Sequence, residues 1–221
     1  MHARVPAIVV VSGLCAGCQT GWSEPALAQR PESKTLPAAR RDGGPALAAV
    51  LAARRSTRVF AHRSLGDTEL GQLLWAAQGA SDGHRTAPSA GALYPITVRV
   101  ADAHAVWRYV PDGHRVVPES AGDRRAQLAA ASFGQDAVRT APAVIAITAT
   151  IAITARKYGV RAERYATLEA GHVAQNVLLQ ATALGLGAVP IGAFDDDAVR
   201  RALAVPGTET PLYLVPVGAA P

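Results

Sequence analysis

Five consecutive residues, Arg-Arg-Ser-Thr-Arg at positions 54–58, carry the most informative chemistry in the sequence. Arg54, Arg55 and Arg58 supply three guanidinium groups, and Ser56 adds a hydroxyl. A guanidinium presents a planar fork of donors that matches phosphate or carboxylate oxygens, so the segment predicts a site for such an anion. The sequence alone leaves open a simpler interpretation, a solvated basic helix end that complements the helix dipole.

A second segment, residues 86–95, reads TAPSAGALYP and consists of small residues between two prolines. Small side chains let a backbone approach a flat ligand closely, and the prolines hold the loop in shape. An ordinary tight turn is the alternative. A hydrolase would need Ser89 as nucleophile, but Ala87 stands where the elbow pattern Gly-x-Ser-x-Gly has its first glycine. We therefore do not expect Ser89 to be a nucleophile.

A third segment, residues 185–192, reads GLGAVPIG and follows a predicted helix. The dinucleotide fingerprint Gly-x-Gly-x-x-Gly fails here, because Pro190 occupies the third glycine position and the glycines precede a strand. The glycines are expected to end the helix. Pro190, Ile191 and Gly192 could then present backbone groups to a ligand.

Lysine and histidine give weaker signals. Lys157 stands beside Tyr158 in a chain whose only other lysine is Lys34; a surface lysine in a loop is the alternative to a functional role. The six histidines form neither a helical metal pair nor a His-Glu-x-x-His motif, so a metal site is not expected.

Composition narrows the class of protein. Of the 221 residues, 49% are apolar and 18% are charged, which excludes a disordered chain and favours one domain. The net charge of +5 comes mostly from arginine, which favours an anionic ligand. Aromatic residues make up 5%, and no basic tract has aromatics interleaved, so nucleic-acid binding is not expected.

Residues 1–28 are predicted to be an export signal. Arg4 precedes the apolar residues 5–17, and Ala26-Leu27-Ala28 is a small-x-small cleavage site. The apolar run is shorter than the roughly 20 residues that span a bilayer. The expected location is the periplasm or cell envelope, with the cytoplasm as the alternative. In a second version the signal is that of a lipoprotein and ends before Cys18, and only then would the protein be attached to a membrane.

The rest of the chain is predicted to form a linker or surface arm over 29–45 and one domain over 46–221. Regular structure is expected to begin after residue 45. Apolar periodicity predicts helices at 46–54, 69–77, 123–131, 161–184 and 195–203, and strands at 96–100, 105–110, 115–118, 143–150, 188–191 and 212–217. The elements lack a strict βαβ rhythm, which predicts an α+β fold. The helix at 161–184 is apolar on more than one face and should be buried in a core or an oligomer interface.

In this order, the segments resemble the nitroreductase superfamily of FMN-dependent oxidoreductases, most closely its SagB-type dehydrogenase branch. The resemblance spans residues 36–218. It is carried by RRSTRVF (54–60), LGQLLWAAQG (70–79), RTAPSAGALYP (85–95), KYGVRAERY (157–165), LEAGHVAQNVLLQATALGLGAVPIGAFDDD (168–197) and PLYLVPVG (211–218).

The resemblance implies a three-layer sandwich with a mostly antiparallel central sheet flanked by helices, in an intertwined homodimer with two interfacial FMN sites. By this resemblance, the FMN phosphate and ribityl chain would be held by Arg54, Arg55, Ser56 and Arg58. The flavin ring would be lined from the partner subunit by Pro88, Ser89, Ala90, Gly91 and Leu93. Its other side and its N5 edge would be met by Pro190, Ile191 and Gly192.

The resemblance also implies that the flavin carries the hydride chemistry, with NAD(P)H as a candidate electron donor. In the branch that oxidises azoline rings in peptides, a Lys-Tyr pair is associated with catalysis, and Lys157-Tyr158 is similar to it. The expected substrate is a small organic molecule or a peptide. Open alternatives are a reductase of nitroaromatics or quinones, an azoline dehydrogenase of peptide maturation, and a non-catalytic flavin-binding protein.

Overall fold

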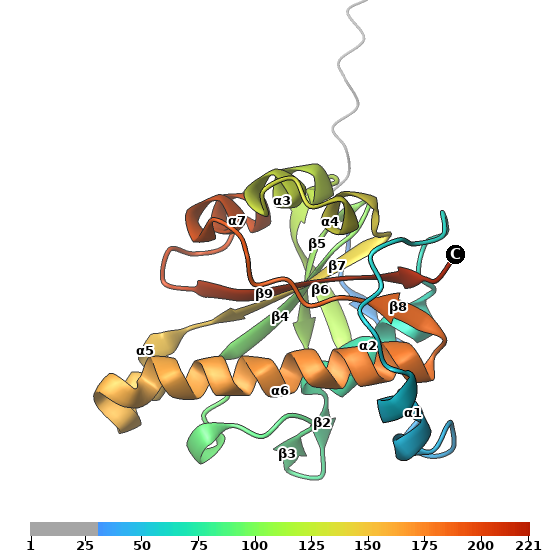
Figure 1. Ribbon diagram of the computed structural model, residues 1–221. Coiled ribbons are helices and arrows are strands. Elements are labelled where there is room, and N and C mark those ends of the chain that lie inside the picture. The colour runs from blue at the N-terminus through green and yellow to red at the C-terminus, as the bar shows by residue number, and fades with distance from the viewer. Residues whose placement is uncertain (1–30) are drawn as a thin grey trace, which may run out of the picture.

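A computed structural model describes residues 31–221, which form a seven-stranded sheet between two layers of helices (Figure 1). The strand order is β1-β6-β5-β4-β7-β9-β8, and every neighbouring pair is antiparallel. The sheet strands are β1 (Lys34–Thr35), β4 (Ile96–Ala101), β5 (Ala105–Val110), β6 (Arg115–Ala121), β7 (Ala143–Ala149), β8 (Leu186–Ala188) and β9 (Thr210–Ala219). The predicted three-layer α+β sandwich is confirmed. The predicted export signal, with Cys18 and the Ala28 cleavage site, lies outside the described residues.

The helices divide between the two faces of the sheet. One layer contains α3 (Arg125–Ala131), α4 (Asp136–Thr140) and α7 (Asp196–Leu203), and the other contains α2 (Asp67–Gln78) and α6 (Ala162–Ala183). The shorter elements are α1 (Leu47–Ala53), α5 (Ile151–Tyr158), the 3-10 turns η1 (Ala90–Ala92) and η2 (Gly159–Arg161), and the hairpin of β2 (Ala80–Ser81) and β3 (His84–Arg85). In Figure 1, α1 and α5 lie at the two ends of α6, and the hairpin lies below its middle. None of the helices within residues 31–221 is long and apolar enough to cross a membrane.

Strand β7 shows why the core forms where it does. All seven of its residues are buried, as predicted for an uninterrupted apolar run in the centre of a sheet. Because side chains alternate along a strand, Ile145 and Ile147 pack beneath α2 and α6, whereas Val144 and Ala146 pack beneath α3 and α7. One strand therefore joins the two hydrophobic cores.

Helix α6 has 22 residues and is about 33 Å long at a rise of 1.5 Å per residue. Its apolar side packs on the sheet through Val173, Val177 and Leu178. Leu168, in contrast, is 53% exposed. The predicted long helix is thus confirmed, and part of its apolar surface remains uncovered in the single chain.

A buried ion network lies on the side of the sheet that carries α3 and α7. The Arg99 side chain on β4 is 2% exposed and donates from Nη1 and Nη2 to Glu209 at 2.6 and 2.9 Å. Its Nε donates to Glu119 at 2.5 Å. Thr148 on β7 also donates to Glu209. These polar groups satisfy one another in a region where apolar side chains form the rest of the core.

One expectation about the chain's organisation is wrong, and one helix was not predicted. Regular structure begins before residue 45, because Lys34 pairs with Val116 across β1 and β6, and Leu36 is buried in the core. Strand β1 is held at the sheet edge by backbone pairing, which needs no apolar pattern in the sequence. The composition of this segment, rich in proline, glycine and charge, therefore gave no sign of a strand. In addition, Lys157 and Tyr158 lie in the last turn of α5, a helix that the sequence did not predict, and not in a loop.

Candidate functional site

The arginine segment, residues 54–58, is joined to β8. Helix α1 ends at Ala53, and the chain then runs extended, so that Ser56 forms a parallel bridge with Ala188. The Thr57 amide donates to the Ala188 carbonyl at 3.0 Å. Two predicted site segments that are more than 130 positions apart in sequence are thereby held side by side.

A glycine makes this close approach possible. A Cβ placed on Gly187 would lie 2.5 Å from Cγ2 of Thr57, which is closer than side-chain atoms can come. Gly185 has a different role, since its φ of +71° ends α6 in the left-handed conformation. The expectation that the glycines end the helix therefore holds for Gly185, and Gly187 serves to admit the arginine segment.

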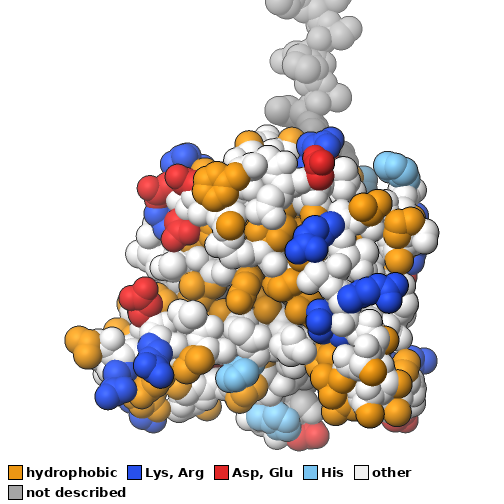
Figure 2. All heavy atoms as spheres, viewed as in Figure 1, with side chains coloured by type: hydrophobic (Ala, Val, Ile, Leu, Met, Phe, Trp, Pro, Cys, Tyr) orange, Lys and Arg blue, Asp and Glu red, His pale blue; other side chains and the backbone are white. Residues whose placement is uncertain are grey.

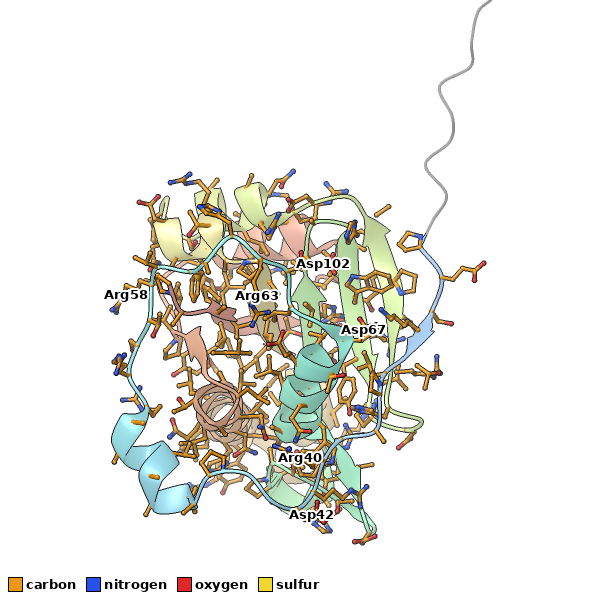
Figure 3. The ribbon with its side chains drawn as sticks, turned by 90° about the vertical axis from the view of Figure 1, so that its right-hand side faces the viewer. Arg40, Asp42, Arg58, Arg63, Asp67 and Asp102 are labelled. Carbon is orange, nitrogen blue, oxygen red and sulfur yellow. The ribbon has the colours of Figure 1, made fainter. Side chains whose placement is uncertain are left out.

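The arginine segment presents open charges at the molecular surface. Arg55, Ser56 and Arg58 are exposed and Arg54 is half-buried. Within residues 31–221, no carboxylate lies within ion-pair distance of these three guanidinium groups. Figure 3 shows Arg58 on the outer side of the segment that rises from α1. The predicted anion site is therefore accessible and is not neutralised by the part of the chain described.

The backbone after β8 is held in place by hydrogen bonds at residues 190–192 (Pro190, Ile191 and Gly192). The Ile191 amide donates to Leu214 at 2.8 Å, and the Leu214 amide donates back at 3.0 Å. Gly192 follows at the surface, and its amide has no hydrogen-bond partner among the described residues. The result is an unused N–H donor on the segment to which the arginine segment is joined.

The proline-bounded loop lies against the Lys-Tyr pair. Gly91 has φ +62°, and a Cβ on it would lie 2.7 Å from Tyr158 Oη and 2.9 Å from Lys157 Nζ. Tyr158 also packs edge-to-face on Tyr165, with ring centres 5.0 Å apart. The positive φ favours glycine at residue 91, and a larger residue there would displace the ends of the Lys157 and Tyr158 side chains. The other predicted loop residues stand around it: Pro88 is exposed, and Ser89, Ala90 and Leu93 are half-buried.

Ser89 is committed to holding this loop. Its Oγ accepts a hydrogen bond from the Tyr94 amide at 2.9 Å, and its side chain also bonds to Glu169 on α6. Glu169 is 2% exposed and accepts from Gln78 Nε2 at 3.4 Å. Burial raises the pKa of Glu169. These contacts account for Ser89 without any nucleophilic role.

Sequence reasoning missed Glu169, although a signal was present. A carboxyl group within the apolar run of α6 is unusual, because a buried charge costs free energy unless it is paired or hydrogen-bonded. Its partners Gln78 and Ser89 come from distant parts of the sequence, and only the fold brings them together.

The predicted residues thus form two clusters and not one. The arginine segment and residues 190–192 lie at the C-terminal end of α6, where β8 begins. The loop at 88–93, Lys157 and Tyr158 lie toward its N-terminal end. The length of α6 separates them within the single chain.

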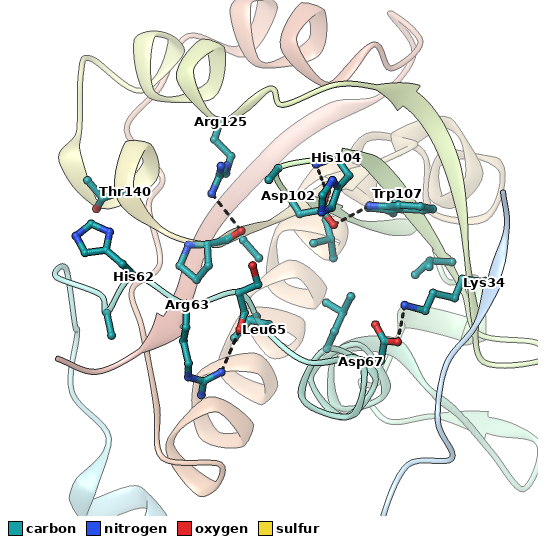
Figure 4. Close-up of a pocket in the computed structure, with 18 residues that line it drawn as sticks. Lys34, His62, Arg63, Leu65, Asp67, Asp102, His104, Trp107, Arg125 and Thr140 are labelled. Atoms are coloured by element: carbon teal, nitrogen blue, oxygen red, sulfur yellow. Dashed lines mark hydrogen bonds and ion pairs between the residues drawn. The ribbon is translucent and has the colours of Figure 1, made fainter. Parts of the chain in front are cut away.

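A pocket of about 480 Å³ lies away from both clusters (Figure 4). Its charged groups already have partners: Lys34 pairs with Asp67, and Arg125 pairs with Asp123 at 2.6 Å. Asp102 accepts from Trp107 Nε1 at 2.9 Å. None of the predicted site residues lines this pocket, and no open charge in it calls for a ligand. Within residues 31–221, no three His, Cys, Asp or Glu side chains gather as a metal site.

Comparisons with known proteins agree with this arrangement. The sequence model of the nitroreductase family matches residues 51–219. A candidate nitroreductase of Methanocaldococcus jannaschii is 44% identical over 180 residues, which cover 76% of this chain and 88% of that protein. The crystal structure of a candidate nitroreductase of Ralstonia eutropha has a TM-score of 0.81 at 30% identity, and the match covers 89% of this chain and 93% of that one.

A more distant structure shares the fold alone. It is a chain of the E. coli microcin synthetase McbBCD complex with truncated pro-MccB17 bound, with a TM-score of 0.67 at 22% identity, covering 76% of this chain and 71% of that one. The family match and the two nearer relatives decide the assignment. This chain belongs to the nitroreductase family, whose members are typically flavin-dependent oxidoreductases.

Proposed function

We propose that this protein is an FMN-dependent oxidoreductase that moves hydride between flavin N5 and a small organic or peptide substrate. The observation that carries the proposal is the junction of the arginine segment with Ala188, two residues before Pro190, which joins a segment with open guanidinium groups to a segment with an unused backbone donor. Bound FMN supplies the hydride chemistry, and the protein supplies binding, orientation and exclusion of water.

The arginine segment fits the phosphate end of the cofactor. A phosphate dianion is held best by forked, charged donors that approach from different directions. Arg54, Arg55 and Arg58 alternate around an extended backbone, and the Ser56 hydroxyl adds a fourth donor. With no competing carboxylate beside these groups in the described chain, the full attraction is available to an incoming phosphate.

Residues 190–192 fit the ring end. Pro190 is half-buried and offers apolar contact, whereas Ile191 is buried in the core, and the two hydrogen bonds between Ile191 and Leu214 hold this backbone in place. The Gly192 amide is then a preorganised donor for the N5 edge of the ring. A donor fixed in advance stabilises developing charge without reorganisation during reaction.

We further propose that the active form is a homodimer. The loop containing Pro88, Ser89, Ala90, Gly91 and Leu93 lies toward the far end of α6, so the same loop of a second subunit would complete each flavin site. In support, large apolar side chains are exposed in the single chain, and Figure 2 shows hydrophobic surface over α1 and beside α6. The exposed apolar side chains include Leu47, Leu51, Val59 and Leu168.

Lys157 and Tyr158 are the proposed catalytic residues. Both polar ends lie against Gly91, so they would face a substrate stacked on the ring. Lys157 carries three donors and Tyr158 one, which suits proton transfer or hydrogen bonding to the substrate atom next to the reacting bond. This position favours, as the finer proposal, a SagB-type azoline dehydrogenase over a general reductase of nitroaromatics or quinones.

The test is anaerobic stopped-flow reduction of the FMN-loaded protein by NADPH or NADH, followed by reoxidation with a nitroaromatic or a quinone. An oxidoreductase shows reduction and reoxidation of the flavin band. A protein that retains FMN but is reduced by neither nucleotide, and that oxidises no azoline peptide, is a flavin-binding protein without turnover. In the Lys157→Met variant, we expect the flavin to be retained and azoline oxidation to be lost.

A further inference from the structure

A group of four cations surrounds the turn between α5 and α6: Arg156, Lys157, Arg161 and Arg164, called here the basic turn. All four side chains are exposed. Among residues 31–221, none has a carboxylate within ion-pair distance. Glu163 is the only acidic residue between positions 151 and 168. Figure 2 shows blue side chains gathered over this end of α6, with hydrophobic ones beside them.

The other cations among residues 31–221 fall into two groups. Seven have carboxylate partners: Lys34, Arg63, Arg99, Arg108, Arg125, Arg139 and Arg200. The rest, which include the arginine segment, have none, as in the basic turn. Arg161 and Arg164 are three positions apart, and like charges at that spacing repel each other. The uncompensated cluster raises the local positive potential and attracts anions from solution.

The basic turn borders the proposed flavin site. Lys157 belongs to both, because its Nζ lies against Gly91 in the loop assigned to the flavin ring. Val160, next to Arg161, is fully exposed, and Leu168, one helical turn after Arg164, is half-exposed. An open groove of about 450 Å³ is lined by Val160, Glu163, Arg164, Thr167 and Leu168. The groove combines apolar contact with the Arg164 cation, and the four cations of the basic turn outnumber its one carboxylate, Glu163, as suits an apolar molecule that ends in an anionic group.

We propose that the basic turn recognises an anionic group on the reactant that meets the flavin, with Arg161 and Arg164 as specificity-determining residues. The ligand class is a partly apolar small molecule or peptide bearing a carboxylate or phosphate. Resting on the proposed function, this inference names its substrate class. The anion belongs either to the oxidising substrate or to a phosphorylated nicotinamide donor, two sources that share the same chemistry.

The test compares matched ligands on the FMN-loaded protein. One arm measures kcat/KM for 4-nitrobenzoate and for its neutral analogue 4-nitrobenzamide, and the other compares NADPH with NADH. The variant R161Q/R164Q removes two charges from the basic turn. The control R139Q/R200Q removes the exposed Arg139 from α4 and the half-buried Arg200 from α7, whose i,i+3 ion pairs contribute little to stability.

We expect R161Q/R164Q to lower kcat/KM for the anionic ligand about tenfold through KM, consistent with loss of electrostatic attraction. The neutral ligand should change less than twofold, and the control should change neither. A loss confined to nitrobenzoate assigns the anion to the substrate, and a loss confined to NADPH assigns it to the donor. Equal effects on charged and neutral ligands overturn the inference.

A binding measurement separates this inference from the proposed function. Isothermal titration calorimetry of both nitro compounds with the oxidised protein needs no turnover. If no acceptor is reduced but nitrobenzoate binds more tightly than nitrobenzamide, and R161Q/R164Q abolishes the difference, anion recognition stands and the proposed reaction fails. If the two nitro compounds bind equally in both proteins, the anion does not belong to the nitro substrate, and if NADPH and NADH also bind equally in both proteins, anion recognition is wrong.

Discussion

The Thr57 amide donates to the carbonyl oxygen of Ala188 at 3.0 Å, and this bond fastens the arginine segment to the strand that leads into Pro190. The two residues belong to segments that fit opposite ends of one FMN molecule, its phosphate and its ring. Because the bond is between backbone atoms, it fixes the spacing of the two ends whatever the side chains do. The half of the proposed site that these two segments form is thus preorganised in the single chain.

The close contact behind that bond predicts the effect of Gly187→Ala. The new Cβ would lie 2.5 Å from Thr57 Cγ2, so the arginine segment must move away from β8. Overpacking of this kind costs about 1–3 kcal/mol. If the whole cost falls on FMN binding, FMN affinity decreases roughly five- to hundredfold. Flavin fluorescence titration measures the Kd.

Two companion variants make the Gly187 result specific. Thr57→Gly removes the obstructing side chain and should restore FMN binding in the double variant with Gly187→Ala. Gly171→Ala on α6 is the matched control, because no atom lies within 4 Å of its new Cβ. Normal FMN affinity in Gly187→Ala would contradict the proposed importance of this junction.

The phosphate role of the arginine segment predicts a difference between two flavins. Arg54→Gln and Arg58→Gln remove charged donors, each of which contributes about 1.5–3 kcal/mol. FMN affinity should therefore fall by about tenfold or more for each variant. Riboflavin lacks the phosphate, so its weaker affinity should stay unchanged. Parallel losses for both flavins would mean that the arginines hold the fold or the ring and not the phosphate.

The buried carboxyl of Glu169 predicts a pH-dependent stability. Burial raises the pKa of Glu169 in the folded state, so its contribution is fully present below the unfolded pKa and is lost as pH rises through the folded pKa. Glu169→Gln cannot titrate. Relative to this variant, the wild-type protein should therefore lose stability as pH increases. Urea unfolding of both proteins, from below the unfolded pKa of Glu169 to above its folded pKa, tests this prediction. A difference in unfolding free energy between the two proteins that does not vary with pH contradicts it.

The ion network around Arg99 predicts the opposite pH dependence. Burial alone raises the pKa of Glu209, but hydrogen bonds from Arg99 and Thr148 outweigh burial and leave the pKa below its usual value. The stabilisation is therefore present above the unfolded pKa and is lost as pH falls through the folded pKa. Thermal unfolding of the wild-type protein at decreasing pH should show this loss.

Removing the arginine should expose the cost of the network directly. Arg99→Met leaves the buried Glu209 without its counterion, whereas Glu119 keeps its pair with Arg108, and an unpaired buried charge costs about 3–5 kcal/mol. Arg139→Met breaks an exposed ion pair and should cost less than about 1 kcal/mol. Equal, small losses in the two variants, measured by urea unfolding, would show that the buried network is dispensable.

The sequence predicted most of the core and the composition of the site, because both follow from local patterns. The uninterrupted apolar run of β7 and the periodicity of α6 identified the sheet centre and its covering helix. The three arginines near Ser56 were visible as a cluster of donors. The spatial arrangement of these parts could not be predicted. Strand β1 forms only by pairing with β6, and glycine is needed at position 187 only because Thr57, far away in sequence, packs against it. Such contacts carry no local signal.

The measurement closest to the central claim is the visible absorption spectrum of the purified protein, recorded before and after addition of FMN and removal of the excess by desalting. We expect a flavin spectrum that persists after desalting at one FMN per chain and disappears in the R54Q/R58Q variant. A protein that is colourless as purified and retains no added FMN would contradict the account. The arginine segment would then be a solvated basic helix end, and the fold would be shared without the chemistry.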